Sequence, residues 1–584
     1  MYMDIVIPIP KATGKISRQK TRSGTYIHYI VDRVYDPKKK HTAPKRVIIG
    51  RLTEDGENMI PNERFLTYFP NTPLPERRAQ ANRSATLSVG PYVVFDRIIK
   101  DYKLNELTEK HFGLKSGLLL DLACYMIQEA QNQAQHYPNY AFRRPLFTEN
   151  MQIMSDATIS RFLSNISDEQ IVGFLKDWNA NREHQERIYI SYDSTNKNTQ
   201  AGDIDFAELG NAKDDKATPI VNIGVAYDST NQVPLFYEVY PGSINDVSQF
   251  RYFVDKALAY EYRNVGFVLD RGYFSRANIE YMDEHKLPFV MMVKGCKPLV
   301  SELIDKHRGS FEDSYSNTIR PLGISGMTVR RGLFSGDDQE RYFHLYFSPQ
   351  KKIAERAKID KTIREMERVI EASKGRVMDF GKPYTDLFEI HVDKKNRLLF
   401  AELRTEIVDR QYARCGYFCI VTSEEMTSRE AYTLYRSRDG SEKIFSSDKT
   451  FLGSASLRVH SSEAMSGKMF VEFVALIIRQ RLYSLLKNEM MSLPVRKSFL
   501  TVPAALGELD KIEATRFNDK CYQLCHAVTK TQATILRACG LKKEDVSESV
   551  ARISEILSKA PKKTPQDQTE EMDEDEDMAE DSFE

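Results

Sequence analysis

The stretch RIYISYDST, residues 187–195, ends an apolar run on an aspartate and decides how the rest of the chain is organised. Its Ile and Tyr residues favour a strand. Two more strands, at 218–228 and 233–240, are separated only by the loop STNQ and should pair as an antiparallel hairpin. A helix, the apolar strand NVGFVLD at 264–270, a second helix and the strand PFVMMVK at 288–294 follow. This order predicts an α/β fold with a mixed sheet covered by helices.

The motif YDSTN occurs twice, at 192–196 and at 227–231. Asp228 lies between two strands that pair with each other, so its side chain should start a turn. Asp193 instead ends the first strand and precedes a long polar stretch. It should lie at the carboxyl end of the sheet, where binding sites of α/β proteins gather. We therefore expect Asp193 to be the aspartate that takes part in chemistry.

Asp270 ends another buried strand, and Gly272 allows the chain to leave that strand sharply. If the first and fourth strands are neighbours, Asp193 and Asp270 lie close together. Two adjacent carboxylates repel each other unless a cation lies between them. Mg²⁺ suits a site made of few carboxylates, water and substrate phosphates. Two such ions, about 3.5–4 Å apart, can stabilise the attacking and leaving oxygens of a phosphodiester displacement.

A third acid comes from the charged segment YRSRDGSEKIFSSDK at 435–449. Its residues Tyr435, Arg438, Glu442 and Lys449 follow the spacing Tyr-x2-Arg-x3-Glu-x6-Lys. On a continuous helix the first three would share one face. That face would present an acid to the metal ions and two hydrogen-bond donors to a phosphate. An ordinary amphipathic charged helix is the alternative interpretation.

With these residues, the chain resembles the DDE transposases of bacterial and archaeal insertion sequences, in the subgroup with the Tyr-Arg-Glu-Lys signature. The resemblance covers roughly 187–490. It implies a ribonuclease-H-like mixed-sheet catalytic core, interrupted by an insertion before the Glu helix.

The resemblance also implies roles for the signature residues. Asp193, Asp270 and Glu442 would bind two Mg²⁺ ions, for which Mn²⁺ can substitute, and would catalyse DNA cleavage and strand transfer. The Tyr, Arg and Lys of the signature would contact phosphates and bases at the inverted-repeat ends, and a homodimer would act on paired ends and target DNA. Relatives that cut through a DNA hairpin stack a flipped base on a Trp in the insertion. The only Trp here is Trp178, upstream of the core, which leaves a hairpin step open.

The net charge of zero hides a division of the chain. Residues 564–584 hold eleven acidic residues and no Lys or Arg, so residues 1–563 carry 83 basic and 72 acidic residues, a net of +11. A basic body with an acidic tail favours a polyanion-binding protein whose tail competes for its basic surface. A solvated tail that only aids solubility is the alternative.

The N-terminal segment is the most basic region, with eleven Lys or Arg against three Asp in residues 1–50. Strands at 25–34 and 46–52 flank a loop that carries Lys38, Lys39 and Lys40. We expect these three lysines to bind the DNA backbone. A basic tip that keeps an edge strand soluble is the alternative.

The pattern predicts seven regions along the chain. They are a basic β-rich DNA-binding segment (1–87), a helical region (88–186), a first core segment (187–296), an insertion (297–412), a second core segment (413–492), a helical region (493–563) and a disordered acidic tail (564–584).

Within the first helical region, the helix near 155–167 and the one that follows it could form a helix-turn-helix. Such pairs of helices also occur in ordinary bundles.

Composition argues against a membrane or disulfide-rich protein. The most apolar stretch, 469–486, contains Glu472, Arg479 and Arg481 and so predicts a core helix rather than a membrane span. The N-terminus has no apolar signal region, and the seven cysteines are scattered. We expect a cytoplasmic, nucleoid-associated protein.

Two rival functions remain open on the sequence. One is a transposase-derived DNA-binding protein that no longer cuts, against which the three acids argue. The other is a general nuclease of the same fold, which would cut unrelated duplexes equally well.

Overall fold

The chain forms two units in the computed structural model, residues 1–83 and residues 84–584. The structure describes residues 6–559 except 22–23, 37–40, 54–55, 63, 71, 73–82, 182–186, 202, 211–217, 245, 263, 294–297, 335–338, 439, 441–451, 453–455, 496 and 517–520. The finer division into seven regions remains a prediction.

The first unit is an antiparallel sheet with strand order β1-β5-β4-β3-β2. Its core is formed by Ile7, Ile27, Ile49, Met59 and Phe65. The two long strands flanking the basic loop confirm the strands expected there, although both extend further toward the loop. The bounds are β1 Ile7–Pro8, β2 Ile16–Thr21, β3 Gly24–Asp36, β4 His41–Leu52, β5 Asn58–Pro61 and α1 Phe65–Tyr68.

A nine-stranded sheet dominates the second unit, in the order β12-β13-β14-β17-β11-β10-β7-β8-β9. The predicted succession of strand, hairpin, helix, strand, helix and strand is confirmed. The corresponding bounds are β7 Ile188–Asn198, β8 Ile220–Asp228, β9 Val233–Pro241, α8 Asp246–Ala259, β10 Val265–Leu269, α9 Arg276–Glu284 and β11 Phe289–Met292.

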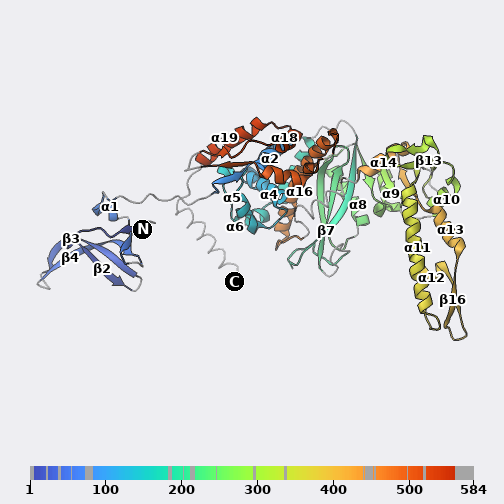
Figure 1. The fold of residues 1–584 in the computed structure, drawn as a ribbon, viewed down its shortest axis with the longest axis horizontal. Coiled ribbons are helices and arrows are strands. Elements are labelled where there is room, and N and C mark those ends of the chain that lie inside the picture. Colours follow the sequence, from blue (N-terminus) through green and yellow to red (C-terminus); the bar gives the residue numbers. More distant parts are fainter. Residues whose placement is uncertain are drawn as a thin grey trace. The chain divides into compact units, whose positions relative to one another are not determined.

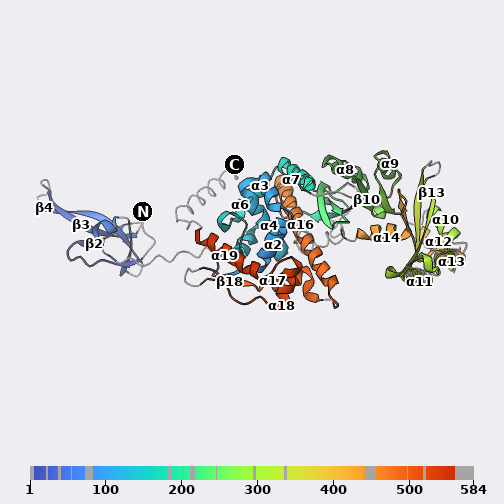
Figure 2. The ribbon, with the colours of Figure 1, turned by 90° about the horizontal axis from the view of Figure 1, so that it is seen from above.

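The five strands β7 to β11 form the core of this sheet. β7, β10 and β11 run parallel, whereas β8 is antiparallel to both β7 and β9. The spatial order of the five, 3-2-1-4-5 in chain order, is consistent with a ribonuclease-H-like mixed sheet. Figure 2 shows α8 and α9 on one side of this sheet and α14, Ser428–Ser437, on the other.

The segment predicted as one insertion, 297–412, is divided between two structures. Its first portion adds β12, β13 and β14 to the central sheet through β17. β14 can take an interior place because most of its sequence, ERYFHLYF, is apolar and buried. The later portion has its own apolar cluster, and Figure 1 shows it extending from the sheet. The bounds are α10 Pro298–His307, β12 Thr318–Ile319, β13 Ile324–Gly332, β14 Glu340–Phe347, α11 Pro349–Ala372, α12 Lys382–Leu387, β15 Phe388–Val392, β16 Leu398–Leu403, α13 Thr405–Arg414 and β17 Tyr417–Thr422.

A helical body surrounds α16, Ser462–Ser492, which packs on α4, α6 and β9 (Figure 1). The helices before and after the sheet join here, because β6 pairs with β18. The bounds are β6 Thr86–Ser88, α2 Gly90–Asp101, α3 Leu104–Phe112, α4 Ser116–Glu129, α5 Tyr137–Phe142, α6 Asp156–Ser164, α7 Asp168–Ala180, α17 Val502–Asp510, β18 Glu513–Thr515, β19 Gln523–Leu524, α18 Lys530–Ala538 and α19 Lys543–Lys559. No helix among the described residues is both long and apolar enough to cross a bilayer.

His344 links three strands of the sheet and makes its stability depend on pH. The imidazole is fully buried on β14, with Nδ1 3.0 Å from the Thr328 hydroxyl on β13 and Nε2 3.0 Å from the Thr422 hydroxyl on β17. Burial lowers its pKa from 6.5 to about 4. Because the unfolded chain takes up this proton more readily than the folded chain, stability should fall as pH drops below 6.5.

We expect the free energy of unfolding of the second unit to decrease by about 2 kcal/mol between pH 8 and pH 5 through this group alone. Urea denaturation of the wild type and of His344→Gln at both pH values would measure it. A wild type and variant with the same pH dependence would contradict this role for His344.

Candidate active site

Asp193 and Asp270 lie next to each other on neighbouring strands. The expectation that Asp193 ends its strand is wrong, because β7 continues to Asn198 and Asp193 pairs with Val225 of β8, whereas Asp270 directly follows β10. The parallel register pairs Tyr192 with Leu269, so the two aspartates occupy the next position on each chain. Neighbouring strands are about 4.8 Å apart. Asp193 and Asp270 are both partly exposed. The expected closeness of the two aspartates depended on the first and fourth strands being neighbours, and β7 and β10 are neighbours.

The two aspartates also belong to the same face of the sheet. Side chains alternate along a strand, and Tyr192 and Phe267 both contact the α8 residue Phe253 on the opposite face. Asp193 therefore belongs to the face on which Tyr435 of α14 meets Asp270. Two carboxylates with adjacent positions on one face repel each other when both are charged.

A buried contact on the α8 side fixes the strand that carries Asp193. The Tyr192 ring stacks on Phe253 at 3.8 Å between centroids, and its hydroxyl donates to Glu238 Oε1 at 2.8 Å. Gly224 on β8 leaves the space for this ring, because a Cβ there would lie 2.5 Å from Tyr192 Cε2. Burial raises the pKa of Glu238. No pattern in the sequence marks this contact.

Tyr435 of α14 donates a hydrogen bond to Asp270 Oδ1 at 3.2 Å. The Tyr435 side chain is 8% exposed, and burial is the main reason why its pKa is raised, with Asp270 raising it further and Arg438 opposing the rise. The Arg438 guanidinium carbon lies 5.5 Å from the Tyr435 ring centroid. The helix α14 therefore brings two residues of the four-residue signature to the carboxylate pair.

The helix that was expected to continue through Glu442 ends earlier. α14 begins with a capping box at Thr427 and ends at Ser437, with Arg438 as its C-cap. The one-face argument for a continuous helix through Glu442 is therefore wrong.

The chain nevertheless returns to the same face before Glu442. Gly440 is helical, and a Cβ on it would lie 2.4 Å from Cε1 of Tyr227. Tyr227 pairs with Ser191, two residues before Asp193 on the neighbouring strand. Glu442 and Lys449 lie outside the described residues, as do Lys38, Lys39 and Lys40. Among the residues that are described, no group of three or more His, Cys, Asp or Glu side chains could hold a metal ion.

The second YDSTN motif has a structural role, as predicted. Asp228 is fully buried, and its carboxylate accepts hydrogen bonds from the backbone N–H groups of Thr230 and Asn231 and from the Asn231 side chain. Trp178 is 1% exposed and donates from Nε1 to the Pro234 carbonyl oxygen at 3.1 Å. It is a core residue of the helical body.

Comparison with known families agrees with this geometry. A family model described as "Transposase DDE domain" matches residues 186–478, slightly more than half of the 584-residue chain. The chain belongs to this family. The match begins just before β7 and ends within α16, so it includes the aspartate pair, α14 and all nine strands of the central sheet. No curated protein matches the chain.

One similar solved structure is a cryo-EM structure of a piggyBac transposase synaptic complex with hairpin DNA. The identity is 11% and the TM-score 0.26, and the similarity covers 65% of this chain and 58% of that transposase. The chain thus spans less than two thirds of the length of this relative.

Proposed function

We propose that this protein is a transposase that binds the inverted-repeat ends of an insertion sequence, cuts the DNA and joins the freed end to target DNA. The observation that carries the proposal is the placement of Asp193 and Asp270 at equivalent positions of two parallel strands, on one face. Membership of the Transposase DDE domain family supports the same reaction class.

The residues present fit a divalent cation. Two adjacent carboxylates with partial solvent access suit Mg²⁺, which binds a few carboxylates and keeps several waters. We propose that Asp193, Asp270 and Glu442 hold two Mg²⁺ ions, for which Mn²⁺ can substitute. The ions supply Lewis-acid stabilisation of the attacking and leaving oxygens of the phosphodiester.

Other residues of the chain orient these acids and the DNA. The Tyr435 hydroxyl fixes one oxygen of Asp270, and the nearby Arg438 provides positive charge for a DNA phosphate. Lys449 would add a further phosphate contact. The basic body and Lys38, Lys39 and Lys40 would supply affinity for duplex DNA that falls steeply with salt. A homodimer on paired ends would process both ends together.

Removing the Tyr435 hydroxyl tests its positioning role. Because outer hydrogen bonds to metal-binding carboxylates typically change affinity or activity ten- to a hundredfold, we expect Tyr435→Phe to lower DNA cleavage by about that factor. It should also raise the Mn²⁺ concentration needed for half-maximal rate. Tyr432→Phe removes a hydroxyl from the same helix beside Tyr346 and Phe418 and is the matched control. Equal rates for the two variants would exclude the role.

The function itself is tested by cleavage of three DNA substrates with Mg²⁺, Mn²⁺ or EDTA. They are a duplex with the element's terminal repeat, the same duplex with a scrambled repeat, and an unrelated duplex. We expect metal-dependent cleavage at the repeat only. Binding to the repeat without cleavage in either metal would establish the DNA-binding rival, and equal cutting of all three duplexes would establish the general nuclease.

A further inference from the structure

The strand β15 lies at an edge of the insertion arm, residues 349–414, which comprises α11, α12, β15, β16 and α13. Figure 1 shows β16 alongside α11 and α12. Among the described residues, β16 is the only strand that pairs with β15. On the far side of β16, Leu398 N donates to Arg376 O and Leu398 O accepts from Gly375 N, both at 2.9 Å. Within the described part of the arm, the outer side of β16 is thus covered at its start, whereas the outer side of β15 is open.

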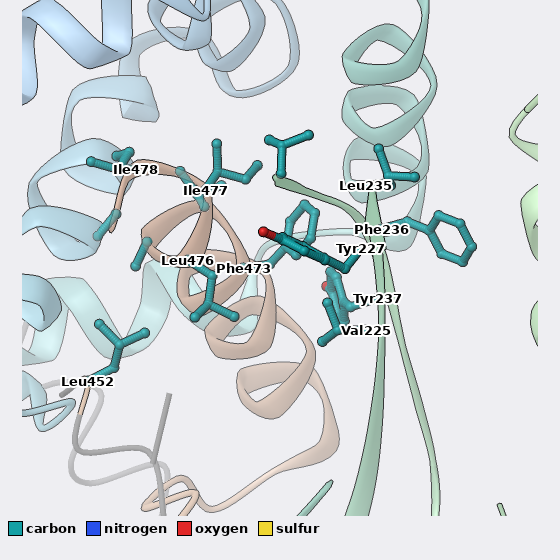
Figure 3. Close-up of a cluster of buried hydrophobic side chains, with 14 of the residues drawn as sticks. Val225, Tyr227, Leu235, Phe236, Tyr237, Leu452, Phe473, Leu476, Ile477 and Ile478 are labelled. Atoms are coloured by element: carbon teal, nitrogen blue, oxygen red, sulfur yellow. The ribbon is translucent and has the colours of Figure 1, made fainter. Parts of the chain in front are cut away.

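The central sheet closes its edges in two ways that β15 lacks. Its edge strand β9 packs against α7 and α16, and Figure 3 shows Phe473 and Leu476 of α16 beside Tyr237 of β9. The opposite edge strand, β12, has only two residues. Proteins keep sheet edges short, covered or charged, because free backbone N–H and C=O groups otherwise pair with a strand of another chain. With five residues, three of them apolar, β15 has the properties of a strand that pairs with another chain.

Alternate residues of β15 direct their backbone groups toward this open side. Directly before the strand, Arg404 N donates to Leu387 O at 2.8 Å, so the residues bonded to β16 are Leu387 and those two and four positions later. In an antiparallel pair, such residues alternate with residues whose N–H and C=O groups point away from the neighbouring strand. The groups that point outward, and can form a further antiparallel ladder, are those of Phe388, Ile390 and Val392.

The side chains of β15 are self-complementary about Ile390. When two copies pair antiparallel with Ile390 at the two-fold axis, Phe388 lies opposite Val392 of the partner subunit. Alternation along the strand places these side chains on one face, and Phe388 and Ile390 belong to the apolar cluster formed with α11. Phe388 is 3% exposed, whereas Val392 is 45% exposed. The pairing therefore covers Val392 and continues the apolar cluster of one arm into that of the other.

The other face of β15 is complementary through charge. Glu389 lies directly opposite Glu402 of β16, and both are exposed. Like charges at such positions destabilise a sheet. The His391 ring stacks on Phe400 at 4.4 Å between centroids, and its Nε2 is 3.9 Å from Glu389 Oε1, too far for a hydrogen bond. In the pairing about Ile390, His391 of the partner subunit lies opposite Glu389, where it can donate to the carboxylate and offset the repulsion by Glu402.

We propose that β15 is a self-association edge, at which two copies of this chain join their insertion arms into one continuous sheet. A pairing of five residues buries less surface than a standard interface of about 1,600 Å², so free copies associate weakly. The association becomes strong once two copies are held close together, because their effective concentration then rises to the millimolar range. The inference deepens the proposed function, and rests on it only for the paired DNA ends that bring two copies together.

Sedimentation equilibrium of the full-length chain, without DNA and in EDTA, tests the edge through its charges. The wild type should dimerise weakly and reversibly. Glu389→Lys sets a lysine opposite the histidine, and His391→Glu sets two glutamates opposite each other, both at two symmetric positions. Each variant should raise the dissociation constant at least about fivefold, whereas Glu389→Lys/His391→Glu should return it to within about twofold of the wild type.

Glu402→Lys is the matched control, since it makes the same change on the same face, one strand farther from the edge. It should leave the dissociation constant within about twofold of the wild type. Both lysine variants should keep their unfolding midpoints, because in each the new lysine faces the remaining glutamate across β15 and β16. A change in association is thereby separated from a loss of fold.

A single cysteine tests the register. On mild oxidation, Ile390→Cys should form a disulfide between two copies, mapped by mass spectrometry, because bonded residues opposite each other in an antiparallel sheet have Cα atoms about 5.5 Å apart. Glu402→Cys should not form one.

The inference would be overturned by a wild type that stays monomeric at the highest soluble concentration, or by a double variant that associates as weakly as the single variants. A Glu402→Lys control that weakens as much as Glu389→Lys, or a disulfide that forms in Glu402→Cys as readily as in Ile390→Cys, would also overturn it. The expected association in a protein that never cleaves DNA would refute the proposed function alone. Repeat-specific cleavage by copies whose association none of these variants changes would refute the edge alone.

Discussion

Replacing Asp193 with asparagine is expected to reduce metal-dependent DNA cleavage by a factor on the order of 10³, and Asp270→Asn by a similar factor. Asparagine keeps the shape of the side chain but removes the charge that a divalent cation requires. The folded chain should be at least as stable as the wild type, because each substitution removes repulsion between adjacent carboxylates. Initial rates on the repeat-containing duplex and urea midpoints measure the two effects.

Variants of two other aspartates distinguish a loss of catalysis from a loss of stability. Asp409→Asn changes an exposed aspartate on α13 and should leave rate and stability unchanged. Asp228→Asn should lower the free energy of unfolding by about 1–3 kcal/mol, because its carboxylate accepts three hydrogen bonds in a buried turn. Its folded fraction should still cut DNA. Full activity of Asp193→Asn, or equal losses in Asp193→Asn and Asp228→Asn at equal folded fraction, would refute the assignment.

Removing the charge of Glu472 should give the largest loss of stability in the chain. Glu472 on α16 and Lys197 at the end of β7 form an ion pair of 2.5 Å, and both residues are at most 2% exposed. Lys468, also buried, donates to the Leu457 carbonyl oxygen, and burial lowers its pKa to about 8. Glu472→Gln would remove the carboxylate that pairs with Lys197 and leave that buried positive charge near a second buried lysine.

We therefore expect Glu472→Gln to lower the free energy of unfolding by about 3–5 kcal/mol, measured by urea denaturation at pH 7. Glu472→Met/Lys197→Met removes both charges and should recover most of that loss, since an apolar pair can replace a buried ion pair at little cost. Raising the pH toward 9 should reduce the loss of stability in Glu472→Gln, because Lys468 then loses its proton and its charge. A double variant as unstable as Glu472→Gln would show that the effect is one of packing rather than of charge.

Local sequence patterns were sufficient for the portion of the site that lies on strands. Each strand of the core carries its own apolar signal, and Asp270 directly follows such a strand, whereas β7 continues through the polar residues after Asp193 to Asn198, which the apolar signal did not predict. The adjacency of Asp193 and Asp270 then follows from the order of the strands. The structural role of Asp228 could also be predicted from a local pattern, because the loop that follows it is short enough to form only a turn.

Patterns failed where tertiary contacts decide the outcome. The spacing of Tyr435, Arg438 and Glu442 suggested one helix, but α14 ends at Ser437, with Arg438 as its C-cap. The strands within 297–412 carry no mark that they pair with β17 rather than with each other alone. The contact of Tyr192 with Glu238 depends on the space left by Gly224, which a single sequence does not reveal.

Arg429 and Arg436 show a pattern whose meaning one sequence does not reveal. They are seven residues apart, the spacing of one helix face, but only Arg436 lies within the signature segment 435–449. Both line a cavity whose other walls come from β8, α16 and residues 319–322, which are distant in sequence.

The position of Mn²⁺ in crystals of the protein, located by anomalous scattering, would show whether the two aspartates hold the metal. We predict an anomalous peak between the carboxylates of Asp193 and Asp270, with Glu442 as a further ligand, and its loss in Asp270→Asn. A peak elsewhere on the chain, or one that persists unchanged in that variant, would contradict the claim that this pair of aspartates is the metal site.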